Sequence, residues 1–311
     1  MISDAEHRFR SGAAAVLCTA VLLLSGCGVS LQTYDDVRAA LPAEELVELD
    51  GQWVHFVRQG AGEPVALIHG FGGSTYSWRD VQPVLAESYD VVAIDLNGFG
   101  YTERPVAQEQ YSLDAQAALV IRLLNHLGID SAHVIGHSYG AGVTLLLALD
   151  YPERVRSIVL VDGGPAEDTP GPSLSPLLAS VYYFYAQHFL LTPNGVRNTL
   201  LSVVYNKSIV TDEVVHAYLD RLRVEGLRSM FEGFLHEVTT PPRDINIQAV
   251  QQPAFVIWGV HDPVFPLATG EQLATEIPGA RIVEFEGSGH LPMEEEPERF
   301  TQEVGAFLAD E

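Results

Sequence analysis

The sequence predicts an α/β fold, in which a mainly parallel sheet carries helices on both faces and is interrupted by a helical insertion. Short apolar runs alternate with longer amphipathic stretches over most of the 311 residues. Several runs are apolar at every position, as strands buried on both faces of a parallel sheet require. The alternation stops at residue 165 and resumes at residue 246, which places one helical insertion inside one sheet.

The composition supports a globular protein and disfavours a nucleic-acid partner. The chain is 47% hydrophobic and 19% charged, which is ordinary for a folded domain with a sizeable core. Lys and Arg number 17 and Asp and Glu number 41, so the formal net charge is −24. A surface this acidic repels phosphate backbones and anionic lipid head groups, so we expect no nucleic-acid binding.

Residues 1–26 have the pattern of an export signal. Arg8 and Arg10 precede an apolar run over 13–24, which is too short to remain as a membrane-spanning helix. The sequence Leu-Ser-Gly-Cys ending at Cys27 resembles the lipobox of bacterial lipoproteins, and that resemblance implies lipidation of Cys27. We therefore expect export and a lipid anchor in a bacterial cell membrane. A plain secretory signal and a soluble secreted protein are the alternative.

Cys18 lies inside the apolar run, so the processed chain would keep only Cys27 and could form no internal disulfide. Residues 27–43 are weakly periodic and are predicted to be a tether. The α/β core is predicted over 44–164 and 246–311, with a helical insertion, the cap, over 165–245. Eight runs are predicted strands: residues 44–50, 53–59, 65–68, 91–94, 132–135, 155–161, 254–258 and 281–285. Five stretches are predicted core helices: residues 76–88, 113–127, 141–149, 270–276 and 297–308.

A G-x-S-x-G sequence at 136–140 points to Ser138 as a nucleophile. It lies between a predicted strand and a predicted helix, which is the strand–turn–helix context that this motif needs. The tight turn forces Ser138 into strained dihedral angles, and small neighbours at Gly136 and Gly140 avoid clashes.

A serine hydroxyl needs an adjacent base, and His290 is the best candidate. It follows the last predicted strand in a Gly-rich loop, from which an imidazole can reach the carboxyl edge of the sheet. The base needs an acid to fix its tautomer. Asp262 follows the preceding predicted strand and is the favoured acid, while Asp162, which ends another strand, is the alternative. This gives the chain order Ser, Asp, His.

Residues 69–73, His-Gly-Phe-Gly-Gly, follow the third predicted strand and allow the backbone to approach a ligand closely. We expect the N–H groups of Phe71 and Tyr139 to form an oxyanion hole. The Gly-rich loop that begins at Asp95 is expected to shape the neighbourhood of the site.

These motifs, in this order, resemble the capped branch of the α/β-hydrolase fold superfamily over about residues 44–311. The resemblance implies an eight-stranded sheet, a lid over the site, and no cofactor or metal. Dehalogenases and epoxide hydrolases of this branch use an Asp nucleophile, so Ser138 argues against both activities. The Asp95 loop also departs from the branch, with Asn97 where Arg is usual and Thr102 where Ser is usual.

The sequence therefore predicts a carboxylesterase-like hydrolase that forms an acyl-enzyme on Ser138. Its partner would be a small ester or acyl substrate. A hydrolase that cleaves a C–C bond beside a ketone has the same triad, and the sequence leaves both reactions open. A ligand-binding protein without turnover is the third hypothesis. Aromatic and apolar residues at 181–185 and 189–191 could line an acyl pocket or pack the lid onto the core.

Overall fold

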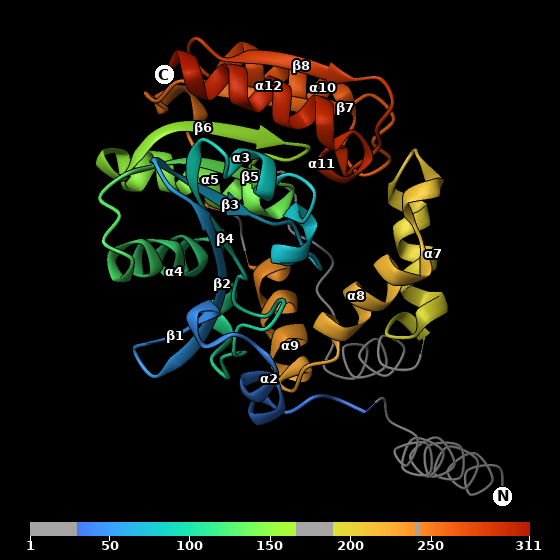
Figure 1. Ribbon diagram of the computed structural model, residues 1–311. Helices are drawn as coiled ribbons and strands as arrows, with labels where there is room; N and C mark the ends of the chain where they lie inside the picture. The colour runs from blue at the N-terminus through green and yellow to red at the C-terminus, as the bar shows by residue number, and fades with distance from the viewer. Residues whose placement is uncertain (1–29, 166–188, 241–242) are drawn as a thin grey trace, which may run out of the picture.

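The computed structural model describes residues 30–165, 189–240 and 243–311. Its centre is an eight-stranded sheet in the order β1-β2-β4-β3-β5-β6-β7-β8 (Figure 1). The strands are β1 (Leu46–Leu49), β2 (Gln52–Gly60), β3 (Glu63–Ile68), β4 (Tyr89–Ile94), β5 (Ala132–His137), β6 (Val155–Val161), β7 (Ala254–Gly259) and β8 (Arg281–Phe285). The predicted α/β fold with a mainly parallel eight-stranded sheet is thereby confirmed.

The first two strands form the antiparallel part of the sheet. Leu49 pairs with Gln52 across a two-residue turn, and both turn residues, Asp50 and Gly51, have positive φ values of 52° and 83°. An Asp-Gly pair is the preferred sequence for such a turn. Strand β2 is antiparallel to β4, and every later pairing is parallel.

Helices cover both faces of the sheet and give it two apolar cores. Helices α4 (Leu113–His126), α5 (Tyr139–Asp150) and α10 (Leu267–Glu276) supply one core with buried Leu, Ile, Val and Ala side chains. Helices α3 (Gln82–Leu85) and α12 (Pro297–Asp310) supply the other. Because both faces are covered, the central strands are buried along nearly their whole length.

The order of the strands creates a crevice at one edge of the sheet. Strand β3 pairs with β4 on one side and β5 on the other, so the chain changes direction within the sheet at β3. Loops that leave the carboxyl ends of strands at such a point diverge, and ligands bind between them. The loops after β3, β5, β7 and β8 carry Phe71, Ser138, Asp262 and His290, and Tyr139 begins α5 directly after Ser138.

The described part of the chain between β6 and β7, inside the segment predicted as a lid, contains three α-helices. They are α7 (Pro193–Val203), α8 (Asp212–Leu222) and α9 (Leu227–Thr239). Figure 1 shows α7 and α8 beside the sheet and α9 nearer to β2 and α2. Buried residues of α7 and α8 belong to the same apolar cluster as α3 and α12, so these cap helices pack on the core.

The predicted tether over 27–43 needs correction in its second part. Helix α2 (Tyr34–Ala40) begins with a capping box, in which Thr33 and Asp36 exchange side-chain to main-chain hydrogen bonds. The segment before it, at Gln32, forms a parallel bridge with Val224 of the cap. The Val37 side chain is buried. This segment is folded because it packs against the cap, a tertiary contact that weak periodicity does not reveal.

The predicted leader and Cys27 lie outside the described residues, as do residues 181–185 of the cap. No helix within the described ranges has both the length and the hydropathy of a membrane span. The same ranges contain no cluster of three or more His, Cys, Asp or Glu side chains that could hold a metal ion.

Candidate active site

Ser138 lies at the turn between β5 and α5. Its dihedral angles, φ 51° and ψ −116°, are strained for a residue with a side chain. The turn holds because the Ser138 N–H donates to Val161 O of the neighbouring strand at 2.8 Å. A Cβ atom on Gly136 would lie 2.2 Å from the Thr144 hydroxyl, and one on Gly140 would lie 2.4 Å from Ile68 O. Only glycine therefore fits on either side of the serine.

The structure brings the three predicted triad side chains together. His290 Nε2 lies 3.0 Å from Ser138 Oγ, and His290 Nδ1 lies 2.8 Å from Asp262 Oδ2. The second oxygen of Asp262 accepts the N–H groups of Val264 at 2.7 Å and Phe265 at 3.2 Å. The Asp262 side chain is fully buried. Its carboxylate is therefore fixed by main-chain donors and can in turn fix the imidazole.

Asp162, the alternative acid, is placed differently. Its Oδ1 accepts the Gly259 N–H at 2.8 Å, and its Oδ2 is buried with no hydrogen-bond partner among the described residues. Burial, together with the nearby charges of Asp262 and Glu295, raises its pKa well above the usual range. The hydrogen bond to Gly259 joins the carboxyl ends of the adjacent strands β6 and β7. His290 Nδ1 bonds to Asp262 and not to Asp162.

The loop that carries His290 is held from both sides. Glu295, on α11 (Pro292–Glu295), accepts the Gly289 N–H at 2.8 Å and the Leu291 N–H at 3.3 Å with one oxygen. Its other oxygen accepts the N–H groups of Tyr205 and Asn206, both at 2.7 Å, at the end of cap helix α7. Glu295 is not recognisable from the sequence, because its run of acidic residues has the pattern of a solvent-exposed surface.

Two further histidines support the site. His137 Nε2 lies 2.7 Å from the main-chain oxygen of His290, so the His137 side chain braces the catalytic loop. His69 bonds to Gly70 O with Nδ1 and accepts the Leu96 N–H with Nε2, which fixes the loop after β3. Burial lowers the pKa of both, well below the usual range for His137, so both are neutral imidazoles.

The two predicted oxyanion donors lie on the loops that flank Ser138. The Tyr139 N–H is the first of α5, where main-chain donors have no partner within the helix. The Phe71 N–H belongs to the loop that His69 fixes. No acceptor among the described residues takes either N–H. The Phe71 ring packs on Phe234 of α9, with ring centroids 4.0 Å apart, and so links this loop to the cap.

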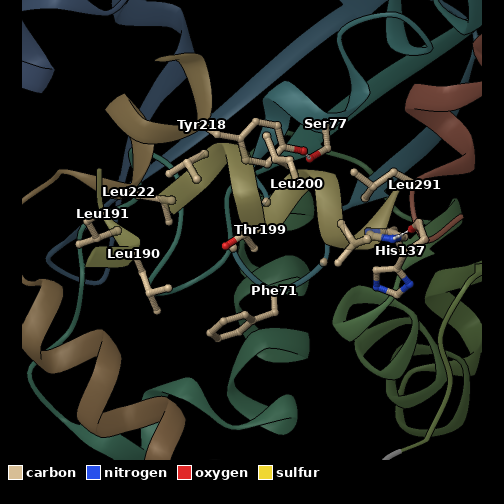
Figure 2. A pocket seen from close by; sticks show the side chains of 16 residues that line it. Phe71, Ser77, His137, Leu190, Leu191, Thr199, Leu200, Tyr218, Leu222 and Leu291 are labelled. Carbon is tan, nitrogen blue, oxygen red and sulfur yellow. Dashed lines mark hydrogen bonds between the residues drawn. The ribbon is translucent and has the colours of Figure 1, made fainter. Parts of the chain in front are cut away.

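A cavity of about 250 Å³ opens beside His290 (Figure 2). Its lining is mostly apolar, from the loop after β3, the residues before α7, and the cap helices α7 and α8. The lining residues are Gly70, Phe71, Gly72, Gly73, Ser77, His137, Leu190, Leu191, Val196, Thr199, Leu200, Val203, Tyr218, Leu222, His290 and Leu291. Leu190 and Leu191, two of the residues predicted to line a pocket or pack the lid, therefore face the cavity.

Comparison with known proteins identifies the family. The sequence profile of the alpha/beta hydrolase fold matches residues 63–297, which is more than half of the chain. The protein belongs to the α/β-hydrolase fold family. This α/β hydrolase is 34% identical over 265 residues to the 2-hydroxymuconate semialdehyde hydrolase of Pseudomonas sp. (strain CF600), covering 81% of this chain and 88% of that protein.

Two other relatives of this α/β hydrolase carry names of the same kind. The 2-hydroxy-6-oxononadienedioate/2-hydroxy-6-oxononatrienedioate hydrolase of Paraburkholderia phymatum is 31% identical over 268 residues, covering 82% of this chain and 90% of that protein. A solved meta-cleavage product hydrolase of Pseudomonas fluorescens superposes with a TM-score of 0.72 at 28% identity, covering 85% of this chain and 97% of that one.

Proposed function

We propose that this α/β hydrolase cleaves a C–C bond beside a ketone carbonyl, with Ser138 as nucleophile, His290 as base and Asp262 as the acid that orients the base. The observation that carries the proposal is the Ser138–His290–Asp262 hydrogen-bond chain in a protein whose relatives are named for hydrolysing oxo-dienoate and semialdehyde substrates. The sequence motifs alone put ester cleavage first, with C–C cleavage as the alternative. The names of these relatives support the alternative.

In the first half of the reaction, His290 Nε2 takes the Ser138 proton while Oγ forms a bond to the carbonyl carbon. The carbonyl oxygen becomes an oxyanion, which the Phe71 and Tyr139 N–H groups stabilise. Donors of this kind contribute about 3 kcal/mol each to the transition state. As the oxyanion collapses, the C–C bond breaks. Its electron pair leaves on the departing carbon, which takes the proton from the His290 imidazolium.

In the second half, His290 removes a proton from water as the water oxygen attacks the acyl carbon on Ser138. The acyl–Oγ bond breaks, the carboxylic acid leaves, and Ser138 regains its proton from His290. Water is the only co-reactant. A carbon leaving group needs a conjugated carbonyl to hold the electron pair, so the substrate class is a vinylogous diketone.

Ester hydrolysis is the second candidate, because the lining of the cavity disfavours the dianionic substrates named for two of the C–C hydrolase relatives. A dienedioate substrate, as in the names of two relatives, carries two carboxylates. Such anions need cationic partners, yet the described residues that line this cavity include no Lys or Arg. A neutral ester meets no such requirement, and the same triad and oxyanion donors would cleave it. A neutral diketone needs no cationic partner either. The lining therefore disfavours dianionic substrates for both candidate reactions.

The test compares two substrates on one preparation. A vinylogous diketone loses its conjugated absorbance when the C–C bond breaks, and p-nitrophenyl esters release a coloured phenol. The proposal expects a higher kcat/KM for the diketone, and a Ser138→Ala variant that turns over neither while its free energy of unfolding stays within about 1 kcal/mol of wild type. A higher kcat/KM for the esters would assign the second candidate.

Folded protein that turns over no carbonyl substrate and whose Ser138 does not react with a fluorophosphonate would indicate a binding protein instead.

We also propose that the full chain is exported and carries a lipid anchor at Cys27. The support is the position of this cysteine after a short apolar run with two arginines before it. Expressed in a bacterial host, the chain should partition into the detergent-rich phase and lack residues 1–26, whereas a Cys27→Ser variant should not be processed at that site. Processed wild-type protein in the aqueous phase would instead support a secreted soluble protein.

A further inference from the structure

A buried chain of polar groups ends inside the otherwise apolar cavity. Ser77 and Tyr218 both line the cavity, and their hydroxyl oxygens lie 3.1 Å apart. The Tyr218 hydroxyl donates a short hydrogen bond to Glu294 Oε1, and Arg79 Nη1 donates to Glu294 Oε2 at 2.7 Å. Ser77, Tyr218 and Glu294 are all buried. Figure 2 shows the two hydroxyls next to each other, across the cavity from the Phe71 ring.

The direction of each hydrogen bond in this chain follows from its charged end. Burial raises the pKa of Glu294, but the charge and hydrogen bond of Arg79 and the hydrogen bond from Tyr218 act against this and favour the carboxylate. A carboxylate only accepts hydrogen bonds. The Tyr218 proton must therefore point to Glu294. Tyr218 can then only accept from Ser77, so the Ser77 proton points to Tyr218. Both hydroxyl protons are committed before any ligand binds.

Ser77 can therefore only accept a hydrogen bond from a ligand. Among the described residues, the Tyr218 hydroxyl is the one side-chain partner of Ser77 Oγ, and it accepts, so the lone pairs of Ser77 Oγ are available on the cavity side. A carboxylate cannot bind there, because it brings no proton and would meet the negative charge of Glu294 behind the two hydroxyls. An uncharged group with an O–H proton fits both the polarity and the charge.

We propose that Ser77 Oγ, oriented by Tyr218 and Glu294, accepts a hydrogen bond from a hydroxyl group on the substrate and thereby selects hydroxyl-bearing, uncharged carbonyl compounds. This inference rests on the proposed function only in taking this cavity as the substrate cavity. The cavity, of about 250 Å³, holds a small ligand only. The hydroxyl therefore lies a few carbons from the carbonyl that reaches Ser138.

The test measures binding to the Ser138→Ala variant, so that turnover plays no part. The probes are pairs of straight-chain methyl ketones, of about four to eight carbons, that end in either a hydroxyl or a methyl group. At one chain length the hydroxyl ketone should bind about five- to tenfold tighter by titration calorimetry. Adding Ser77→Ala should remove that preference. Adding Ser202→Ala, which removes a hydroxyl of α7 outside this lining, should keep it.

A second variant tests the direction of the hydrogen bonds. In Tyr218→Phe the Ser77 proton loses its acceptor and becomes free to donate. This variant, added to Ser138→Ala, should bind a methoxy-ended ketone, which offers only an acceptor, more tightly relative to the methyl-ended ketone. If circular dichroism shows that it does not fold, Ser77→Ala alone decides.

Equal affinities for the paired probes at every length, or a preference that survives Ser77→Ala, would overturn the inference. Its failure is distinguishable from failure of the proposed function. Wild-type protein that cleaves neither ketone nor ester, with the binding preference intact, would reject the reaction and keep the subsite.

Discussion

The Glu295→Gln substitution tests whether one buried carboxylate holds the catalytic histidine in place. Glu295 accepts four main-chain N–H groups, two that flank His290 and two at the end of cap helix α7. A glutamine keeps one oxygen and presents an NH₂ group to the other pair of donors. The bond from Leu291 is the longest of the four, at 3.3 Å. The amide nitrogen should therefore face the Gly289 and Leu291 side, where least is lost.

The expected magnitude follows from counting donors. Two buried N–H groups lose their acceptor, at about 1–3 kcal/mol each, so the free energy of unfolding should fall by about 4 kcal/mol. Both groups flank His290, so its imidazole should lose its alignment with Ser138. A misplacement of about 1 Å at a reacting group can lower the rate about 100-fold. We therefore expect kcat to fall by about 10- to 100-fold, beyond any effect on the folded fraction.

Urea titrations give the stability, and kcat is measured on protein shown to be folded by circular dichroism. The neighbouring Glu296→Gln is the matched control. Glu296 accepts Gly287 N–H and Ser288 Oγ with the same oxygen, so a glutamine can keep both bonds, and the expected loss is below about 1 kcal/mol. If Glu295→Gln matched this control in both stability and kcat, the carboxylate would have no positioning role.

Three further predictions concern the acids and the strained serine. Asp262→Asn should lower kcat/KM by about 10⁴-fold, whereas Asp162→Asn should lower it less than about tenfold, because Asp162 bonds to the Gly259 N–H and not to His290; the reverse ranking would transfer the acid role to Asp162. Burial alone would raise the pKa of Asp95, but His55 and main-chain donors lower it from 3.8 to about 2. Its contribution of about 2 kcal/mol is therefore present above pH 4 and is lost as the pH falls towards 2. Urea titrations at several pH values should show a smaller loss over this range for Asp95→Asn, and equal slopes would contradict the assignment. Ser138→Gly should be more stable than Ser138→Ala by about 1 kcal/mol in the free energy of unfolding, because glycine relieves the strain at φ 51°. Its melting temperature should therefore be higher, and equal melting temperatures would argue against strain.

The strands could be predicted from local sequence, because each is an apolar run whose ends are visible in the sequence. The triad could be predicted for a related reason. Ser138, Asp262 and His290 each follow a predicted strand, and parallel strands bring their carboxyl ends to one edge. The prediction of one helix over 76–88 is wrong. The structure divides this stretch into a 3₁₀ turn, Thr75–Trp78, and the short helix α3, with Pro83 in the first turn of that helix.

The parts that sequence did not predict depend on contacts between distant segments. Glu294 and Glu295 lie in a run of three acidic residues, and in a chain with 41 Asp and Glu such a run resembles a solvated surface. Their burial becomes visible only when the cap packs against α11. Helix α2 did have a local signal, the capping box at Thr33 and Asp36, but seven residues with one buried apolar side chain do not make a stable helix alone.

The two buried acids of α11 imply that the cap and the catalytic base are mechanically connected. Glu295 joins the end of α7 to the loop of His290, and the His290 N–H itself donates to Val203 O of α7 at 2.9 Å. Glu294, one residue earlier, holds Tyr218 of α8 at the cavity wall. A shift of α7 or α8 must therefore break charge-assisted hydrogen bonds to Glu295, beside His290, or to Glu294, at the cavity wall. The position of the cap and the position of the His290 loop are thus coupled. A substrate that displaces α7 should consequently show a loss in kcat along with a change in KM, whereas one that fits beneath the helix should leave kcat unchanged.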